Sequence, residues 1–452
     1  MTRSPAPRPR PRILPCLAFI AALWPANTLL GQAAVRAVFV ANNGDLTGSV
    51  TSFTLGPDLA PVLQTHLVTG TRAVLTDPCA GCKAYEIALT PNGRYLAVAH
   101  VSGNPDALTI LQVAADAAIS QVLQINLPAG SDGPLDVLWL DDEYLAVLRA
   151  VPNPDQVAIY RFTPAPPSLS FLNAYAVGTG GSHLAIHPSR QYLYVNNSSP
   201  SPARQVYAFS VAAGGVLTQI DAEPTGTPAP FELAVSPNGL WLYAVCGDTG
   251  TGQQVLGLNI APDGTLSPMP GSPFTTPSLS PTNLFVTEDN AYCVVGHAAD
   301  ALARVLLINP ATGALSPTAH FFDVGNAGTL GDVRSMRDLL FLTDNSASDN
   351  GLIGLYSLTI GGGGALTPNG PIASSGGAAP RALAAWTPPI PGDADCDGDL
   401  DLDDVPAFVA ALVYPPVYAD TWPFCRPLRC DLNGDGLLDG RDIHLFTDAL
   451  VP

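Results

Sequence analysis

The stretch YEIALTPNGRYLAVAH, at residues 85–100, contains the pattern that decides the fold. Two later stretches repeat it: SHLAIHPSRQYLYVNN at residues 182–197 and FELAVSPNGLWLYAVC at residues 231–246. Each consists of a short apolar run, a turn such as PNG or PSR, and a second apolar run. Short runs rich in β-branched and aromatic residues, separated by turn residues, are typical of β-hairpins. The chain therefore repeats a hairpin-containing unit.

Weaker copies of this unit lie between and after the clear ones: LDVLWLDDEYLAVLR, TNLFVTEDNAYCVVG and GDVRSMRDLLFLTD. Two further strand-like segments follow each copy, such as RQVYAFSV and GVLTQIDAEP after the second clear copy. Successive copies are 47 to 51 residues apart. Four short strands per repeat at this period, with no amphipathic helix between them, predict a β-propeller.

The two ends of the repeat region predict how the ring closes. RAVFVANNG, at residues 36–44, matches the second strand of a repeat, and PRALAAW, at residues 380–386, matches a first strand. Pairing of these segments would form a composite blade and leave no open sheet edge. Six complete repeats and this composite blade predict a mainly β, seven-bladed propeller over residues 34–388.

Composition and charge restrict the partners. The chain has 452 residues, of which 47% are hydrophobic and 13% charged, and its formal net charge is −19. Lys83 is the only lysine. An acidic chain without a basic run repels phosphate backbones, which excludes nucleic acid as a partner and favours cations.

The N-terminus has the three parts of a secretory signal: basic MTRSPAPRPRPR, apolar ILPCLAFIAALW and the small-residue site GQA. Residues 1–33 are therefore predicted to be a signal peptide, and the mature protein to be secreted, periplasmic or at the cell surface. No later segment is long and apolar enough to cross a membrane. Export permits disulfides, so PCAGC is interpreted as a small Cys79–Cys82 disulfide rather than a redox or zinc site.

One position of the repeat carries polar residues where packing alone favours apolar ones. It lies just before the first apolar run, on the strand that lines the central channel of a propeller. Its occupants are Glu86, Asp136, His183, Glu232, Asn283, Asp332 and Ala382. Confined charges cost free energy unless they are paired or coordinated. Three interpretations stay open for this ring: structural hydrogen bonding, catalysis, or a bound divalent metal.

The repeats resemble those of the lactonase family of seven-bladed propellers, which includes propeller-type 6-phosphogluconolactonases. The resemblance covers residues 34–388. GSHLAIHP at residues 181–188 is similar to the family's P-R-H-x-x-x-H-P motif and places His183 on its catalytic histidine. FELAVSP at residues 231–237 is similar to the motif that supplies a glutamate, and places Glu232 on it. Thr282 stands where the family has an arginine.

The resemblance implies a lactonase-type carboxylic ester hydrolase acting on a small lactone. His183 would act as general base or acid, and Glu232 would orient or assist it. Without the arginine, a metal held by Glu86, Asp136, Glu232, Asn283 and Asp332 could polarise the carbonyl instead. The alternative is a non-catalytic binding or scaffold propeller at the cell surface.

A Pro-rich break, TPPIPG, precedes an acidic tail that is predicted to form a separate domain over residues 389–452. DADCDGDLDLDD at residues 393–404 and DLNGDGLLDGRD at residues 431–442 both fit the twelve-residue calcium loop. The spacing predicts two Ca²⁺ ions. The candidate ligands are Asp393, Asp395, Asp397, Asp399, Asp401 and Asp404 in the first loop, and Asp431, Asn433, Asp435, Leu437, Asp439 and Asp442 in the second.

A helix is expected after each loop, VPAFVAALV and IHLFTDALV. Paired EF-hand-type loop–helix units with Asp at position 12 resemble type I dockerin modules. That resemblance implies a small α-helical calcium domain with a cohesin-like or other cell-surface partner. The usual Ser-Thr recognition pair is replaced by Leu402-Asp403 and Gly440-Arg441, which favours a calcium-stabilised tether over cellulosome docking.

Overall fold

The computed structural model describes residues 35–101, 105–128, 133–150, 154–200, 203–226, 229–246, 254–325, 330–349, 352–388, 390–395, 400–422, 427–434 and 437–450. The predicted signal peptide lies outside the described residues, as do Asp397, Asp399 and Asp435 of the predicted calcium loops. Within the described ranges, no helix combines the length and apolar character that crossing a membrane would need.

The predicted hairpins form antiparallel sheets of four or five strands, and there are seven such sheets in the described part of the chain. The composite sheet contains β1 (Ala37–Asn43), β2 (Thr47–Leu55), β3 (Pro61–Thr71) and β30 (Pro380–Trp386). The next three contain β4 (Ala84–Leu89), β5 (Tyr95–His100), β6 (Ala107–Val113) and β7 (Ile119–Asn126); β8 (Pro134–Trp139), β9 (Tyr144–Arg149), β10 (Gln156–Pro164) and β11 (Pro167–Ala176); and β12 (Leu184–Ile186), β13 (Tyr192–Asn197), β14 (Gln205–Ala212) and β15 (Val216–Pro224).

The remaining three sheets complete the ring. They contain β16 (Pro230–Val235), β17 (Trp241–Cys246), β18 (Gln254–Ile260), β19 (Leu266–Pro268) and β20 (Phe274–Thr275); β21 (Pro281–Val286), β22 (Tyr292–His297), β23 (Leu302–Ile308) and β24 (Leu315–Asp323); and β25 (Leu330–Met336), β26 (Leu339–Asp349), β27 (Leu352–Ile360), β28 (Leu366–Pro368) and β29 (Ala373–Ser374). A 3₁₀ turn, η1 (Gly362–Gly364), follows β27. The first strands of successive sheets contact one another in the closed order β30, β4, β8, β12, β16, β21, β25 and back to β30. The predicted seven-bladed, mainly β propeller is therefore confirmed.

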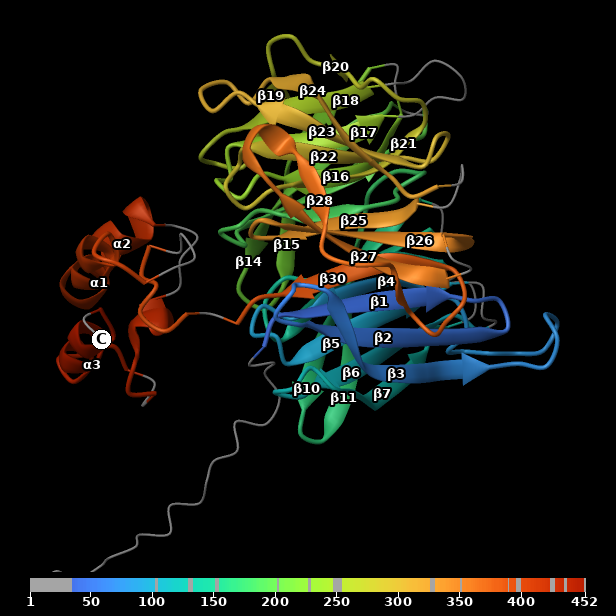
Figure 1. Ribbon diagram of the computed structural model, residues 1–452, viewed down its shortest axis with the longest axis horizontal. Coiled ribbons are helices and arrows are strands. Elements are labelled where there is room, and N and C mark those ends of the chain that lie inside the picture. Colours follow the sequence, from blue (N-terminus) through green and yellow to red (C-terminus); the bar gives the residue numbers. More distant parts are fainter. Residues whose placement is uncertain are drawn as a thin grey trace, which may run out of the picture. The chain divides into compact units, whose positions relative to one another are not determined.

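The composite blade closes the ring as predicted. β1 pairs with β30 from Ala37 opposite Trp386 to Ala41 opposite Ala382. Figure 1 shows the two strands side by side, β1 in blue and β30 in orange, from opposite ends of the colour scale. The inner edge of β1 consequently has its backbone hydrogen bonds satisfied by a strand more than 300 residues later in the sequence.

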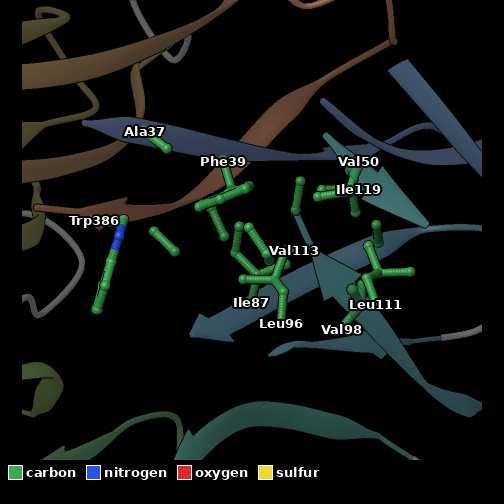
Figure 2. Packing of buried hydrophobic residues seen from close by; sticks show 14 of the residues in the cluster. Ala37, Phe39, Val50, Ile87, Leu96, Val98, Leu111, Val113, Ile119 and Trp386 are labelled. Atoms are coloured by element: carbon green, nitrogen blue, oxygen red, sulfur yellow. The ribbon is translucent and has the colours of Figure 1, made fainter. Parts of the chain in front are cut away.

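The core consists of seven apolar clusters, one between each pair of adjacent blades. Side chains alternate along a strand, so Phe39 packs toward the second blade while Val38 and Val40 pack toward the seventh. Figure 2 shows Phe39 beside Ile87 and Leu96 of the second blade, with Trp386 at the edge of the cluster. Burial on both faces explains why the inner strands are almost continuously apolar, as β1 is.

The hairpin turns have a common geometry that explains their residues. The third turn residue has a positive φ in four copies, at Gly93, Arg190, Gly239 and Asn290. Glycine adopts this conformation without steric strain, and asparagine tolerates it better than most residues. Gly93 has a second constraint, since an added Cβ would lie 2.5 Å from Cζ2 of Trp386.

The disulfide predicted between Cys79 and Cys82 is also confirmed.

The C-terminal segment forms a small helical unit with its own core. Its elements are α1 (Asp404–Val413), α2 (Pro415–Thr421), the 3₁₀ turn η2 (Pro427–Cys430) and α3 (Asp442–Leu450). The helices predicted after the two acidic loops are α1 and α3, whereas α2 was not predicted. Phe408 of α1 stacks on Phe446 of α3 with ring centroids 3.9 Å apart, so the two loop–helix units pack against each other.

Replacing Phe39 with alanine should lower the free energy of unfolding by about 3–5 kcal/mol, because it leaves a cavity in a fully buried inter-blade cluster. Chemical denaturation of the two proteins would measure this loss. Leu63→Ala, on the outer strand β3 where the side chain is 47% exposed, is the matched control and should change it by about 0.5 kcal/mol or less. Equal effects of the two changes would contradict the assignment of the core.

Candidate functional site

Side chains at the polar ring position line a cavity of about 570 Å³ at one mouth of the channel. Its walls include five of the predicted ring residues and two arginines: Glu86, His183, Glu232, Asn283, Asp332, Arg334 and Arg381. The remaining polar residue of the predicted ring, Asp136, lies next to His183 and is only 4% exposed. The predicted ring therefore exists, and most of it faces one cavity.

Three ring residues link neighbouring blades. Asp136 accepts a 2.6 Å hydrogen bond from the backbone N–H of Leu184 in the next blade. Asp332 accepts one of 2.9 Å from the N–H of Leu383. Asn283 instead donates through Nδ2 to a backbone carbonyl of the seventh blade, over 2.7 Å. Each side chain satisfies a buried backbone group of its neighbour, which is the structural role that the sequence left open.

His183 and Glu232 are adjacent at the cavity wall, as the resemblance predicted. His183 Nε2 lies 3.7 Å from Oε1 of Glu232, and Nδ1 lies 3.7 Å from Oδ2 of Asp136. The backbone N–H of His183 donates a 2.7 Å hydrogen bond to Oδ1 of Asn196 on β13, which fixes the start of β12. The imidazole is therefore held between two carboxyl groups.

An arginine that the sequence analysis missed completes this group. Nη1 of Arg334, on β25, lies 3.2 Å from Oε1 of Glu232 and 2.8 Å from Oδ1 of Asp332. Thr282, the position where the resemblance expects an arginine, is exposed and offers only its hydroxyl. An arginine therefore lies beside Glu232, but it comes from the seventh blade, one blade beyond the position of Thr282.

A signal for Arg334 was available in the repeat. It stands two residues after the ring position, and therefore on the same side of its strand. The other six blades have apolar residues there: Ala88, Leu138, Ala185, Ala234, Phe285 and Ala384. An arginine at a position that is otherwise apolar requires a nearby anion, and two ring carboxylates provide it.

A family model matches part of the chain. The family model "Lactonase, 7-bladed beta-propeller" matches residues 32–256, which include His183 and Glu232. The match covers just under half of the chain. No curated protein matches the chain.

Solved structures share the lactonase-like fold. A Bacteroides uniformis protein described provisionally as a 6-phosphogluconolactonase aligns with a TM-score of 0.61 and 12% identity, over 78% of this chain and 100% of the other. A periplasmic gluconolactonase of Pseudomonas aeruginosa aligns with a TM-score of 0.59 and 16% identity, also over 78% and 100%. At these identities the likeness shows a common fold.

The titratable groups at the channel mouth have shifted pKa values. Burial, together with the charge of Arg334, lowers the pKa of His183 to about 3, so the imidazole is neutral at neutral pH. Burial raises the pKa of Glu232 to about 8, although Arg334 opposes the shift. Burial and the charge of Asp332 raise the pKa of Glu86 to about 7. The mouth therefore contains a neutral base and carboxyl groups that hold protons near neutral pH.

A second arginine, Arg381 on β30 of the neighbouring composite blade, also lines the cavity. The guanidinium carbon of Arg381 lies 3.7 Å from the ring centroid of Tyr85, a cation–π contact that fixes its position.

Arg334 lies among the carboxylates where the sequence allowed a divalent metal. Its guanidinium contacts Glu232 and Asp332, two of the candidate metal ligands.

In the C-terminal unit, carboxylates of the first predicted calcium loop converge. Asp393, Asp395 and Asp404 each place one carboxylate oxygen within 4.8 Å of the others. Asp404 Oδ1 accepts a 2.6 Å hydrogen bond from Ala394 N–H, and Oδ2 accepts one of 2.9 Å from Asp401 N–H. Arg429 Nη1 lies 2.8 Å from Oδ2 of Asp393.

The second loop repeats the same internal arrangement. Asp442 Oδ1 accepts a hydrogen bond from Asn433 N–H, over 3.1 Å, and Oδ2 accepts one from Asp439 N–H, over 2.9 Å. Asp431 accepts from Gly434 N–H, over 2.9 Å, while Leu437 is 62% exposed. The position-12 aspartate therefore organises the backbone of each loop in the same way.

Glu86→Gln should change how the free energy of unfolding depends on pH. The pKa of Glu86 is raised from 4.5 in the unfolded reference to about 7 in the folded chain. Its stabilising contribution is therefore complete below pH 4.5 and is lost as pH rises through about 7. The glutamine variant lacks this loss, so it should gain stability relative to the unmodified protein between pH 5 and 8. Denaturant titrations at both pH values would measure the difference, and a pH-independent difference would contradict the shifted pKa.

Proposed function

We propose that the propeller hydrolyses a lactone, with His183, Glu232 and Arg334 as its catalytic group. The observation that carries this proposal is the arginine beside Glu232, 3.2 Å from its carboxylate. Ring opening places negative charge on the former carbonyl oxygen, and a fixed guanidinium stabilises such charge. The arrangement thus supplies the function that Thr282 does not.

In the proposed mechanism, neutral His183 takes a proton from a water molecule as that water attacks the carbonyl carbon. The imidazolium that forms lies between Asp136 and Glu232, whose carboxyl groups are 3.7 Å from its two nitrogens. Carboxyl groups so close to both ring nitrogens restrict the orientation of the imidazole. Arg334 faces the developing oxyanion, and its contacts with Glu232 and Asp332 hold it in place.

The substrate class proposed is a sugar lactone of the aldonolactone type. Two similarly folded proteins are described as a gluconolactonase and, provisionally, as a 6-phosphogluconolactonase. A cavity of about 570 Å³ is ample for such a ring. We further propose that the chain is exported, on the basis of the basic, apolar and small-residue parts of its N-terminus.

Arg334→Ala should reduce kcat/KM for gluconolactone by about a hundredfold to a thousandfold, the range seen when an oxyanion-stabilising donor is removed. His183→Ala should reduce it to the level of the background reaction. Rates of acid release at neutral pH, corrected for spontaneous opening, would measure both. Arg161 is an exposed arginine on β10 that pairs with Glu143. Arg161→Ala is therefore the control and should retain full activity. Full activity of the Arg334 variant would refute its role.

We also propose that the C-terminal unit binds two calcium ions and serves as an EF-hand-type, dockerin-like tether. This proposal is supported by the convergence of Asp393, Asp395 and Asp404 and by the same backbone arrangement around Asp442. Oxygen ligands in a twelve-residue loop suit Ca²⁺. The tether would attach the exported propeller to a cell-surface partner.

Chelation of calcium should lower the melting temperature of the helical unit, because an ion that binds only the folded state stabilises it. Asp404→Asn should remove one of two binding events in calorimetric titration, and Asp442→Asn the other. Asp448→Asn, an exposed acid on α3, is the control and should leave both events intact. Unchanged titrations in both loop variants would exclude these loops as the calcium sites.

A further inference from the structure

One ring carboxylate has no role in the arrangement described above. Asp136, Asn283 and Asp332 bond the backbone of the next blade, whereas His183 and Glu232 form the catalytic group with Arg334. Glu86 does neither, although its side chain lines the same cavity. Within the described part of the chain, its one hydrogen bond is a 3.3 Å contact with the N–H of the adjacent Ile87.

We propose that Glu86 is the general acid of the reaction and protonates the departing ring oxygen of the lactone. This inference rests on the proposed lactonase function. In the described part of the chain this carboxyl group makes no inter-blade hydrogen bond, and its burial costs free energy, so it calls for an explanation other than a framework role. Donation of a proton to a ligand in the cavity provides one.

The position of Glu86 in the ring suits this role. From Glu86, on the second blade, Glu232 is reached after three blades in one direction and four in the other. The two groups therefore lie on opposite sides of the channel mouth. A lactone between them presents its carbonyl carbon to His183 and Arg334 and its ring oxygen to Glu86.

The bonds and protons balance. Water oxygen bonds to the carbonyl carbon, one water proton passes to His183, and the bond from the carbonyl carbon to the ring oxygen breaks. The ring oxygen takes the proton of Glu86 and becomes the hydroxyl of the product. The proton held by His183 leaves as the hydroxy acid ionises, and Glu86 regains a proton from solvent. No oxidant, reductant or co-reactant other than water is needed.

The charges around Glu86 are consistent with a proton donor. Burial and the charge of Asp332 raise its pKa to about 7, while Arg334 and Arg381 oppose the shift. The charge of Glu86 in turn contributes to the raised pKa values of Asp136 and Glu232. Glu86 therefore retains its proton over much of the slightly acidic to neutral range, which is the form a general acid needs.

The test compares two lactones whose leaving groups differ. δ-Valerolactone releases an alkoxide, which needs a proton, whereas dihydrocoumarin releases a phenolate, comparable to a tyrosinate with a conjugate-acid pKa of about 10. Glu86→Gln should reduce kcat/KM for δ-valerolactone about a hundredfold and for dihydrocoumarin about threefold or less, because general acid catalysis typically contributes a hundredfold or more. The fall in activity of the unmodified protein above pH 7 should also be absent from the variant.

Two further variants separate catalysis from structure. Glu86→Asp keeps a proton donor that is one methylene shorter, and should recover part of the activity on δ-valerolactone. Glu143→Gln, an exposed glutamate outside the channel, should behave as the unmodified protein on both substrates. Equal losses on the two lactones in Glu86→Gln, or no loss on either, would overturn the role of Glu86. Absence of any lactonase activity in the unmodified protein would instead overturn the proposed function, and the assignment of Glu86 with it.

Discussion

The pairing of β1 with β30 is the constraint on which the rest of the propeller depends. It joins residues from the two ends of the propeller into one sheet, so the ring has no free inner edge. The inter-blade clusters on both sides of this composite blade then complete the ring of seven. Because each blade contacts only its neighbours, a break at this seam would expose apolar faces on two blades at once.

Closure also determines the chemistry of the channel mouth. Repeats of similar length place equivalent residues at the same height, and closing the ring brings them around one cavity. Charges brought together in this way lose hydration, which raises the pKa values of Glu86 and Glu232 and lowers that of His183. Arg334 offsets only part of this cost, so the mouth holds protons at neutral pH. The shifted pKa values therefore follow from the architecture and this choice of side chains.

Residues at the same repeat position have two roles: some hydrogen-bond to the next blade, and some line the cavity. Asp136 and Asp332 use their carboxylates to accept hydrogen bonds from the backbone of the next blade. His183 and Glu232 line the cavity. In Asp136, the oxygen that accepts the Leu184 N–H also lies 3.7 Å from His183. The same oxygen of Asp136 therefore joins two blades and lies next to the imidazole of His183.

The sequence by itself determined the repeat, the blade number, the composite closure and the ring of polar residues, because strand periodicity and turn residues are local properties of the chain. It also identified His183 and Glu232, and the helices that follow both acidic loops. Only the tertiary structure decided which polar residues join blades and which line the cavity without doing so, since Asp136 and Glu86 occupy the same place in the repeat. The role of Arg334 was likewise decided in three dimensions: its partner Glu232 is 102 residues earlier in the chain, and only the closed ring brings the guanidinium and that carboxylate into contact.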